Sequence, residues 1–163
     1  MDSKLINQLA KHIREIYFGV NWTWSNLKDQ LSDVTWEEAN RKVYSLNTIL
    51  ALTYHIQYYI PPLVSVIKGG PLTGKDKFSF DHPTIQSKEE WDNFVTNIFE
   101  EAEALAGLIE RLDEDILWEI FSEEKYGNYF RNIQGFVEHA HYHLGQIVVI
   151  KKILRNERII NDE

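Results

Sequence analysis

The stretch KGGPLTGKDKFSFDHPTIQ, from Lys68 to Gln86, decides how this chain folds. It holds three of the eight glycines and two of the four prolines of the chain, and its apolar residues have no helical spacing. Its 19 residues make a loop that is unusually long for a compact domain, but such a loop can span up to about 60 Å. A helix of about 30 residues is only about 45 Å long. The stretch therefore predicts a long crossover between two parallel helices of a four-helix bundle.

Segments with helical spacing of apolar residues lie on both sides of this crossover. Capping boxes, a Ser or Thr followed three residues later by Glu, mark two helix starts at Thr35 and Ser87. Pro61 and Pro62 should kink or end the second helix. The expected helical segments cover about residues 3–31 (with a break at Gly19 or Asn21), 35–66, 87–109 and 128–155. The sequence thus predicts a single all-α domain over residues 1–163.

Composition excludes several classes of protein. The chain has no cysteine, which rules out disulfides, thiolate metal ligands and a cysteine nucleophile, and which suits a reducing compartment. Its formal net charge of −8 argues against nucleic acid as a partner, because affinity for a phosphate backbone depends largely on Lys and Arg. The N-terminal MDSKLINQLAKH lacks the features of a signal peptide, and no apolar run is long enough to span a membrane. We expect a cytoplasmic protein without a membrane partner.

Three of the six histidines are crowded into the first five residues of HAHYHLGQI, from His139 to Ile147. His139 and His143 are four residues apart on the predicted last helix, so they project from one face, one turn apart. Apolar residues such as Phe136 continue this face, which points the two imidazoles into the bundle. His141 lies about 200° around the helix from them, and we expect it at the surface.

Two imidazoles one turn apart form a chelate for a borderline divalent metal, although such a pair can also be a satisfied part of the core. Two ligands hold a metal poorly, so a third has to come from another helix. His55, halfway along the second predicted helix, lies at the matching depth and is the candidate. His12 is expected at the surface, whereas His82 in the crossover could line the mouth of a pocket.

Three histidine ligands leave a fourth coordination position open, which is typical of catalytic rather than structural zinc sites. Such a metal lowers the pKa of bound water or holds a substrate anion such as a thiolate. Because the chain has no thiol, a thiolate would come from a small-molecule substrate or cosubstrate.

Other polar residues have candidate roles around this site. Gln146, three residues after His143, could orient a ligand imidazole or could satisfy nearby backbone groups. Tyr58 or Tyr59 could form a wall of the pocket beside His55. Glu138 would act as a base only if the bundle curves around it.

The same residues resemble the DinB-like superfamily, which includes YfiT-type and bacillithiol-transferase proteins. The resemblance rests on a mid-helix histidine, His55, and on the downstream pattern His139, His143 and Gly145–Gln146–Ile147. It covers nearly the whole chain and implies a four-helix bundle in up-down-down-up order, often dimeric. It also implies one divalent metal, commonly Zn or Ni, at the three histidines. Characterised relatives are metal-dependent transferases or isomerases that use low-molecular-weight thiols.

Two classes of function remain open at this point. The first is a metal-dependent enzyme, a thiol transferase or a hydrolase of small molecules. The second is a non-catalytic bundle that binds a metal or a small ligand. The resemblance favours the enzyme and a homodimer.

Overall fold

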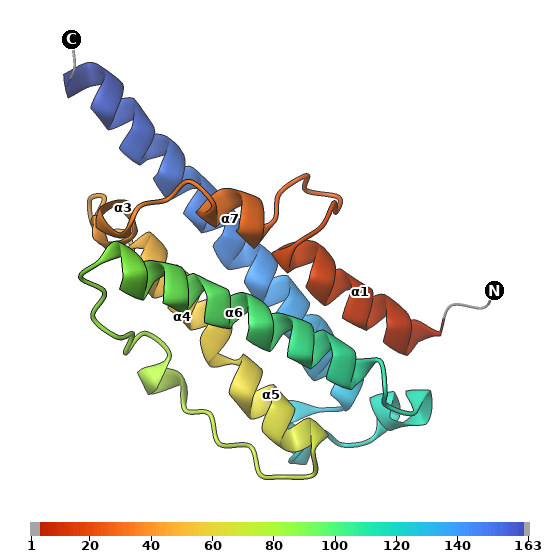
Figure 1. Cartoon of the computed structure of the whole chain (residues 1–163). Helices are drawn as coiled ribbons and strands as arrows, with labels where there is room; N and C mark the ends of the chain where they lie inside the picture. Colours follow the sequence, from red (N-terminus) through yellow and green to blue (C-terminus); the bar gives the residue numbers. More distant parts are fainter. Residues whose placement is uncertain (1–3, 162–163) are drawn as a thin grey trace.

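The computed structural model describes residues 4–161, with side chains as far as residue 156, and most of this part of the chain is helical (Figure 1). The elements in chain order are α1 (Leu5–Tyr17), α2 (Leu27–Leu31), α3 (Trp36–Asn40), α4 (Ile49–Tyr58), α5 (Ile60–Ile67), η1 (Asp76–Phe78), α6 (Lys88–Ile109), η2 (Glu114–Trp118), η3 (Glu124–Tyr126) and α7 (Tyr129–Asn161). The only bridge between extended residues in the described ranges joins Ile120 to Asn128. The predicted all-α class is confirmed.

The long helices pack side by side along their lengths. α1 contacts α6 and α7, α4 contacts α7, and α5 contacts α6. The segment 68–87 leaves the end of α5 and runs back past α5 and α4 to the start of α6 (Figure 1). The crossover stretch from Lys68 to Gln86 thus covers the side of the molecule where α4 and α5 lie.

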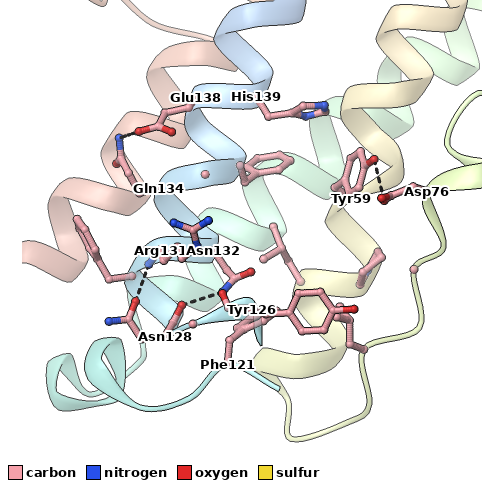
Figure 2. A pocket seen from close by; sticks show the side chains of 18 of the residues that line it. Tyr59, Asp76, Phe121, Tyr126, Asn128, Arg131, Asn132, Gln134, Glu138 and His139 are labelled. Atoms are coloured by element: carbon pink, nitrogen blue, oxygen red, sulfur yellow. Dashed lines mark hydrogen bonds between the residues drawn. The ribbon is translucent and has the colours of Figure 1, made fainter. Parts of the chain in front are cut away.

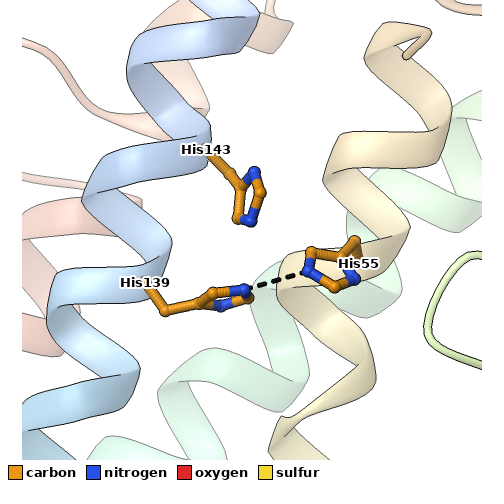
Figure 3. Close-up of side chains that lie close together, drawn as sticks. All are labelled: His55, His139 and His143. Atoms are coloured by element: carbon orange, nitrogen blue, oxygen red, sulfur yellow. Dashed lines mark hydrogen bonds between the residues drawn. The ribbon is translucent and has the colours of Figure 1, made fainter. Parts of the chain in front are cut away.

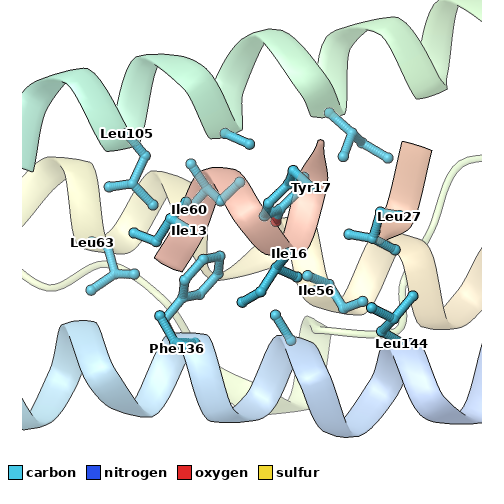
Figure 4. Packing of buried hydrophobic residues seen from close by; sticks show 14 of the residues in the cluster. Ile13, Ile16, Tyr17, Leu27, Ile56, Ile60, Leu63, Leu105, Phe136 and Leu144 are labelled. Atoms are coloured by element: carbon cyan, nitrogen blue, oxygen red, sulfur yellow. The ribbon is translucent and has the colours of Figure 1, made fainter. Parts of the chain in front are cut away.

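A single hydrophobic core lies between these helices (Figure 4). Its fully buried members come from several elements, among them Ile13, Ile16, Leu27, Ile56, Leu105 and Ile147. Burying one such side chain contributes about 1.5–3 kcal/mol relative to leaving it in water. In the described part of the chain, no helix is both long and apolar enough to cross a lipid bilayer.

The second predicted helix is in fact three helices. The capping box at Thr35 is present, with both of its hydrogen bonds to Glu38, but α3 ends after a little more than one turn at Asn40. Tyr44 then has a positive φ of 50°, which a helix does not accommodate. The prediction of a helix over residues 41–48 was wrong, because the apolar spacing there continued by coincidence through a turn.

The local sequence explains where α4 and α5 begin. Thr48 accepts a hydrogen bond from the Ala51 N–H at 3.0 Å and so caps α4. Pro61 and Pro62 occupy the first turn of α5, where their missing N–H groups are not needed. The predicted interruption by this proline pair is therefore present, as the break between α4 and α5.

Removing the cap of α4 tests this account. We expect Thr48→Ala to lower the free energy of unfolding by about 1 kcal/mol, because one buried start of a helix loses its acceptor. Urea denaturation followed by circular dichroism measures the change. Thr48→Ser keeps the hydroxyl and should stay within a few tenths of a kcal/mol of the parent; equal losses in both variants would contradict the capping role.

Candidate metal site

Contact between α4 and α7 brings three imidazoles together (Figure 3). α4 contributes His55, and α7 contributes His139 and His143 from successive turns. One ligand nitrogen from each ring lies within 4.8 Å of the other two. His55 and His143 are 7% and 8% exposed, and His139 is half-buried. The spacing rule and the choice of His55 from the sequence therefore both led to groups that lie together.

Hydrogen bonds determine which nitrogen of His55 faces its neighbours. Its Nδ1 lies 3.2 Å from the carbonyl oxygen of Ser79. A carbonyl only accepts hydrogen bonds, so Nδ1 carries the proton and Nε2 keeps its lone pair. That lone pair lies 3.0 Å from Nε2 of His139, which donates to it. Coordination of a metal by both rings requires the His139 proton to leave Nε2.

A similar contact orients His143. Its Nδ1 lies 2.7 Å from Oε1 of Gln146, one turn further along α7. An Nδ1–H bond to an amide oxygen leaves Nε2 available as a ligand, which is the usual arrangement around metal-binding histidines. Of the two roles considered for Gln146, the structure shows the contact with a candidate ligand.

The donor set fits a divalent transition metal. Zn–N bonds of about 2.0–2.1 Å in a tetrahedral site place ligand nitrogens roughly 3.3 Å apart. The His55–His139 pair at 3.0 Å is close to this value, and the widest separation, within 4.8 Å, needs ring movements of about an ångström. Neutral imidazoles suit Zn, Ni, Cu and Fe rather than Mg or Ca. The three histidines could therefore hold a metal ion.

Burial favours the neutral form of His55 and His139. Desolvation, followed by the proximity of His143 and His55, lowers the pKa of His139 to about 4. Desolvation is also the main cause that lowers the pKa of His55, with His143 adding to it. Near neutral pH both rings are thus in the form that binds metals.

Aromatic residues enclose the triad. The ring of Tyr59 meets His55 and His139 edge-on, with centroid distances of 5.3 and 4.9 Å. Its hydroxyl donates to Asp76 at 3.3 Å, and burial raises the pKa of Tyr59, so the phenol stays protonated. Phe80 of the crossover stacks on His55 at 4.0 Å, with the two ring planes 7° apart.

A cleft of about 1050 Å³ leads away from the triad along α7 (Figure 2). His139 and Tyr59 lie at one end of it, and Phe121 and Asn128 lie at the other. Its size is at the upper end of the range for small-molecule sites. The candidate metal site therefore borders, through His139, a cavity of small-molecule size.

The structure places the other predicted residues as follows. Tyr58 is held by both backbone groups of Lys75, to which its hydroxyl donates and from which it accepts. His82 contacts the Pro83 carbonyl and the ring of Tyr54, and it does not line the large cleft.

The remaining predicted residues lie outside the triad. His12 is exposed, as expected. His141 is half-buried rather than at the surface, because its Nδ1 lies 3.2 Å from the Val137 carbonyl of its own helix. Glu138 lines the cleft but points away from His139 and toward Gln134 (Figure 2).

Sequence reasoning missed the contributions of the crossover itself. Ser79, Phe80 and Asp76 all contact the triad or Tyr59. The only available signal was the aromatic, charged composition of the segment before His82, which is unusual for a solvated loop. Spacing rules do not apply to a segment without a helical or strand period, so nothing could place these residues.

Comparisons of the chain with family models, with curated proteins and with solved structures found no match. The resemblance to DinB-like proteins therefore stays a prediction.

The lowered histidine pKa values predict how stability depends on pH. An unfolded histidine has a pKa of about 6.5, whereas His139 has about 4 in the fold. Between these values the unfolded state binds more protons, so the free energy of unfolding falls as the pH drops. The slope contributed by His139 is at most about 1.4 kcal/mol per pH unit, and smaller because the ring is half-exposed.

Denaturation of chelator-treated protein from pH 7 to 4.5 measures this slope. We expect a shallower dependence in His139→Asn than in the parent, because the variant lacks the titrating ring. His12→Asn, which removes an exposed histidine far from the triad, is the matched control. Parallel curves for His139→Asn and the parent would show that the buried ring does not disfavour its charged form.

Proposed function

We propose that the protein is a metal-dependent enzyme of the DinB-like type, acting on a small molecule at His55, His139 and His143. A transfer reaction that uses a low-molecular-weight thiol is the favoured chemistry, and hydrolysis is the alternative. The observation that carries the proposal is the convergence of three imidazoles, one of which, His139, lines a cleft of substrate size.

The metal would be Zn²⁺ or Ni²⁺, held by the three imidazoles. Bound there, a divalent cation supplies Lewis acidity, which favours the deprotonated form of a thiol or of water at neutral pH. Within the described residues the candidate group holds three ligands and no fourth, which would leave one coordination position open, and His139 of the three lines the cleft beside Tyr59. An open position of this kind supports catalysis over a purely structural role.

The surrounding residues have separate tasks in this proposal. Ser79 and Gln146 hold the Nδ1 side of His55 and His143, which orients the Nε2 lone pairs. Phe80 covers His55 and excludes water from one side of the ring. Tyr59, protonated and hydrogen-bonded to Asp76, offers a hydroxyl proton beside His139.

The arrangement of the chain is consistent with the family that we propose. The contacts of the long helices and the long return of residues 68–87 support an up-down-down-up four-helix bundle. The resemblance is also the basis for expecting a homodimer, and the composition is the basis for expecting a cytoplasmic protein.

Metal content tests the ligand assignment. Elemental analysis of protein purified without an affinity tag should find about one divalent ion per chain. We expect His55→Ala, His139→Ala and His143→Ala each to lose at least 90% of it, because roughly 10–100-fold in affinity is lost even when an outer-shell partner is changed. His141→Ala is the matched control and should keep its metal. Full metal content in His55→Ala would remove α4 from the site.

Thiol chemistry tests the reaction class. We expect the metal-loaded protein to accelerate the reaction of bacillithiol, glutathione or cysteine with an electrophile such as monobromobimane. Chelation and His55→Ala should abolish the acceleration, and His141→Ala should retain it. If metal is bound but no thiol reacts faster and no ester is hydrolysed, the binding-module alternative is correct.

A further inference from the structure

The cleft beside the triad follows one face of α7. Arg131, Gly135 and His139 occur at four-residue intervals on this helix, and all three line the cleft. The rise of 1.5 Å per residue puts about 12 Å between the first and the last. A molecule lying along this face with one end at the triad reaches Arg131 with the other.

No close packing contact explains the presence of a glycine at position 135 within the helix. A glycine inside a helix costs up to about 1 kcal/mol relative to alanine. Such a cost is often explained by a close neighbour, but a Cβ at Gly135 would meet no other atom within 4 Å. The effect of the missing side chain is instead to keep the cleft open between Arg131 and His139.

Arg131 is placed at this cleft by the preceding turn. Gly127 has a φ of +72°, and a Cβ there would lie 2.8 Å from Cδ of Arg131, so the arginine stem packs on the bare glycine backbone. Within the described part of the chain, no ion pair or side-chain hydrogen bond engages the guanidinium. Figure 2 shows Arg131 between the Asn128 end of the cleft and His139.

Charged side chains of both signs line the cleft. Asp76 lies at the triad end, where it accepts the Tyr59 hydroxyl, and Glu138 points away from the triad. Arg131 lies about 12 Å along the helix, whereas Lys75, which directly precedes Asp76 in the crossover, is the other cationic residue of the lining. Apolar side chains make up much of the rest of the lining, among them Leu63, Leu72, Phe130 and Phe136.

We propose that the cleft binds an elongated apolar carboxylic acid, with its carboxylate on Arg131 and its apolar body over Gly135. Its far end then lies at the three histidines, and this last point alone rests on the proposed function. A guanidinium pairs with a carboxylate in a bidentate manner, which fixes the orientation as well as the affinity. The Asp76 carboxylate disfavours the reverse orientation.

Calorimetric titration with three eight-carbon probes tests the charge preference: octanoate, octanamide and octyltrimethylammonium. We expect octanoate to bind tightest. Arg131→Gln should weaken octanoate at least about tenfold, as loss of a hydrogen bond to a charged group does, and should leave octanamide unchanged. Arg111→Gln removes the same charge outside the cleft and should have no effect. Equal binding of the three probes, or an unaffected Arg131→Gln, overturns the assignment of the carboxylate.

Two glycines of the same helix test the path of the ligand. Gly135→Leu should fold normally, because its side chain enters open space, but it should abolish binding of octanoate and octanamide. Gly145→Leu is the matched control, since a Cβ there also meets nothing within 4 Å and the residue lines a separate hollow near Gln146. Circular dichroism and metal content verify that both variants are intact. Octanoate binding that survives in Gly135→Leu overturns the proposal.

Parent protein stripped of metal by a chelator separates this inference from the proposed function. We expect it to bind octanoate as the metal-loaded protein does, with the same dependence on Arg131. Loss of metal binding or of thiol chemistry therefore leaves the acid site standing. Octanoate affinity that disappears with the metal, or an absence of measurable binding at millimolar octanoate in the parent, overturns the acid site.

Discussion

A hydrogen bond from Nδ1 of His55 to the carbonyl of Ser79 joins the middle of α4 to the long crossover. Because the carbonyl cannot donate, this one contact sets both the tautomer and the orientation of the ring. It also keeps the crossover close to the triad, where Phe80 stacks on the same imidazole and Asp76 reaches Tyr59. The site is therefore built from two helices and a loop, and the loop is not an accessory to it.

Burial of three histidines in contact is electrostatically compatible with a metal site. An imidazolium at His55 or His139 would be desolvated and would lie beside other rings, so the fold lowers the pKa of these two rings and favours their neutral form. Coordination needs the same neutral form. The free energy of unfolding and the fraction of neutral, metal-binding imidazole therefore both fall as the pH drops. The packing that favours neutral rings in the absence of a metal also keeps them in the form that can coordinate a cation.

The sequence was most informative where chemistry coincides with a helical period. Four-residue spacing correctly put His139 and His143 on one face, and depth along a helix was enough to choose His55. It failed where a period continued by coincidence, as at Val43 and Leu46, which lie in a turn that the cap at Thr48 terminates. The crossover residues have no period at all. Their positions depend on long-range contacts that a single sequence does not encode locally.

In the proposed acid site, the histidine end and the cationic end of the cleft lie on one continuous helix, α7, and this would constrain how the ligand preference can change. Along an α-helix, positions on a given face recur only about once per turn. Adding one residue between Arg131 and His139 would rotate the guanidinium about 100° around the helix and out of the cleft. It would not simply lengthen the distance between the two residues. Related chains could accept longer or shorter molecules only by moving the cation a whole turn. Selection for ligand length along this helix would thus proceed in discrete steps of about 5.4 Å rather than continuously.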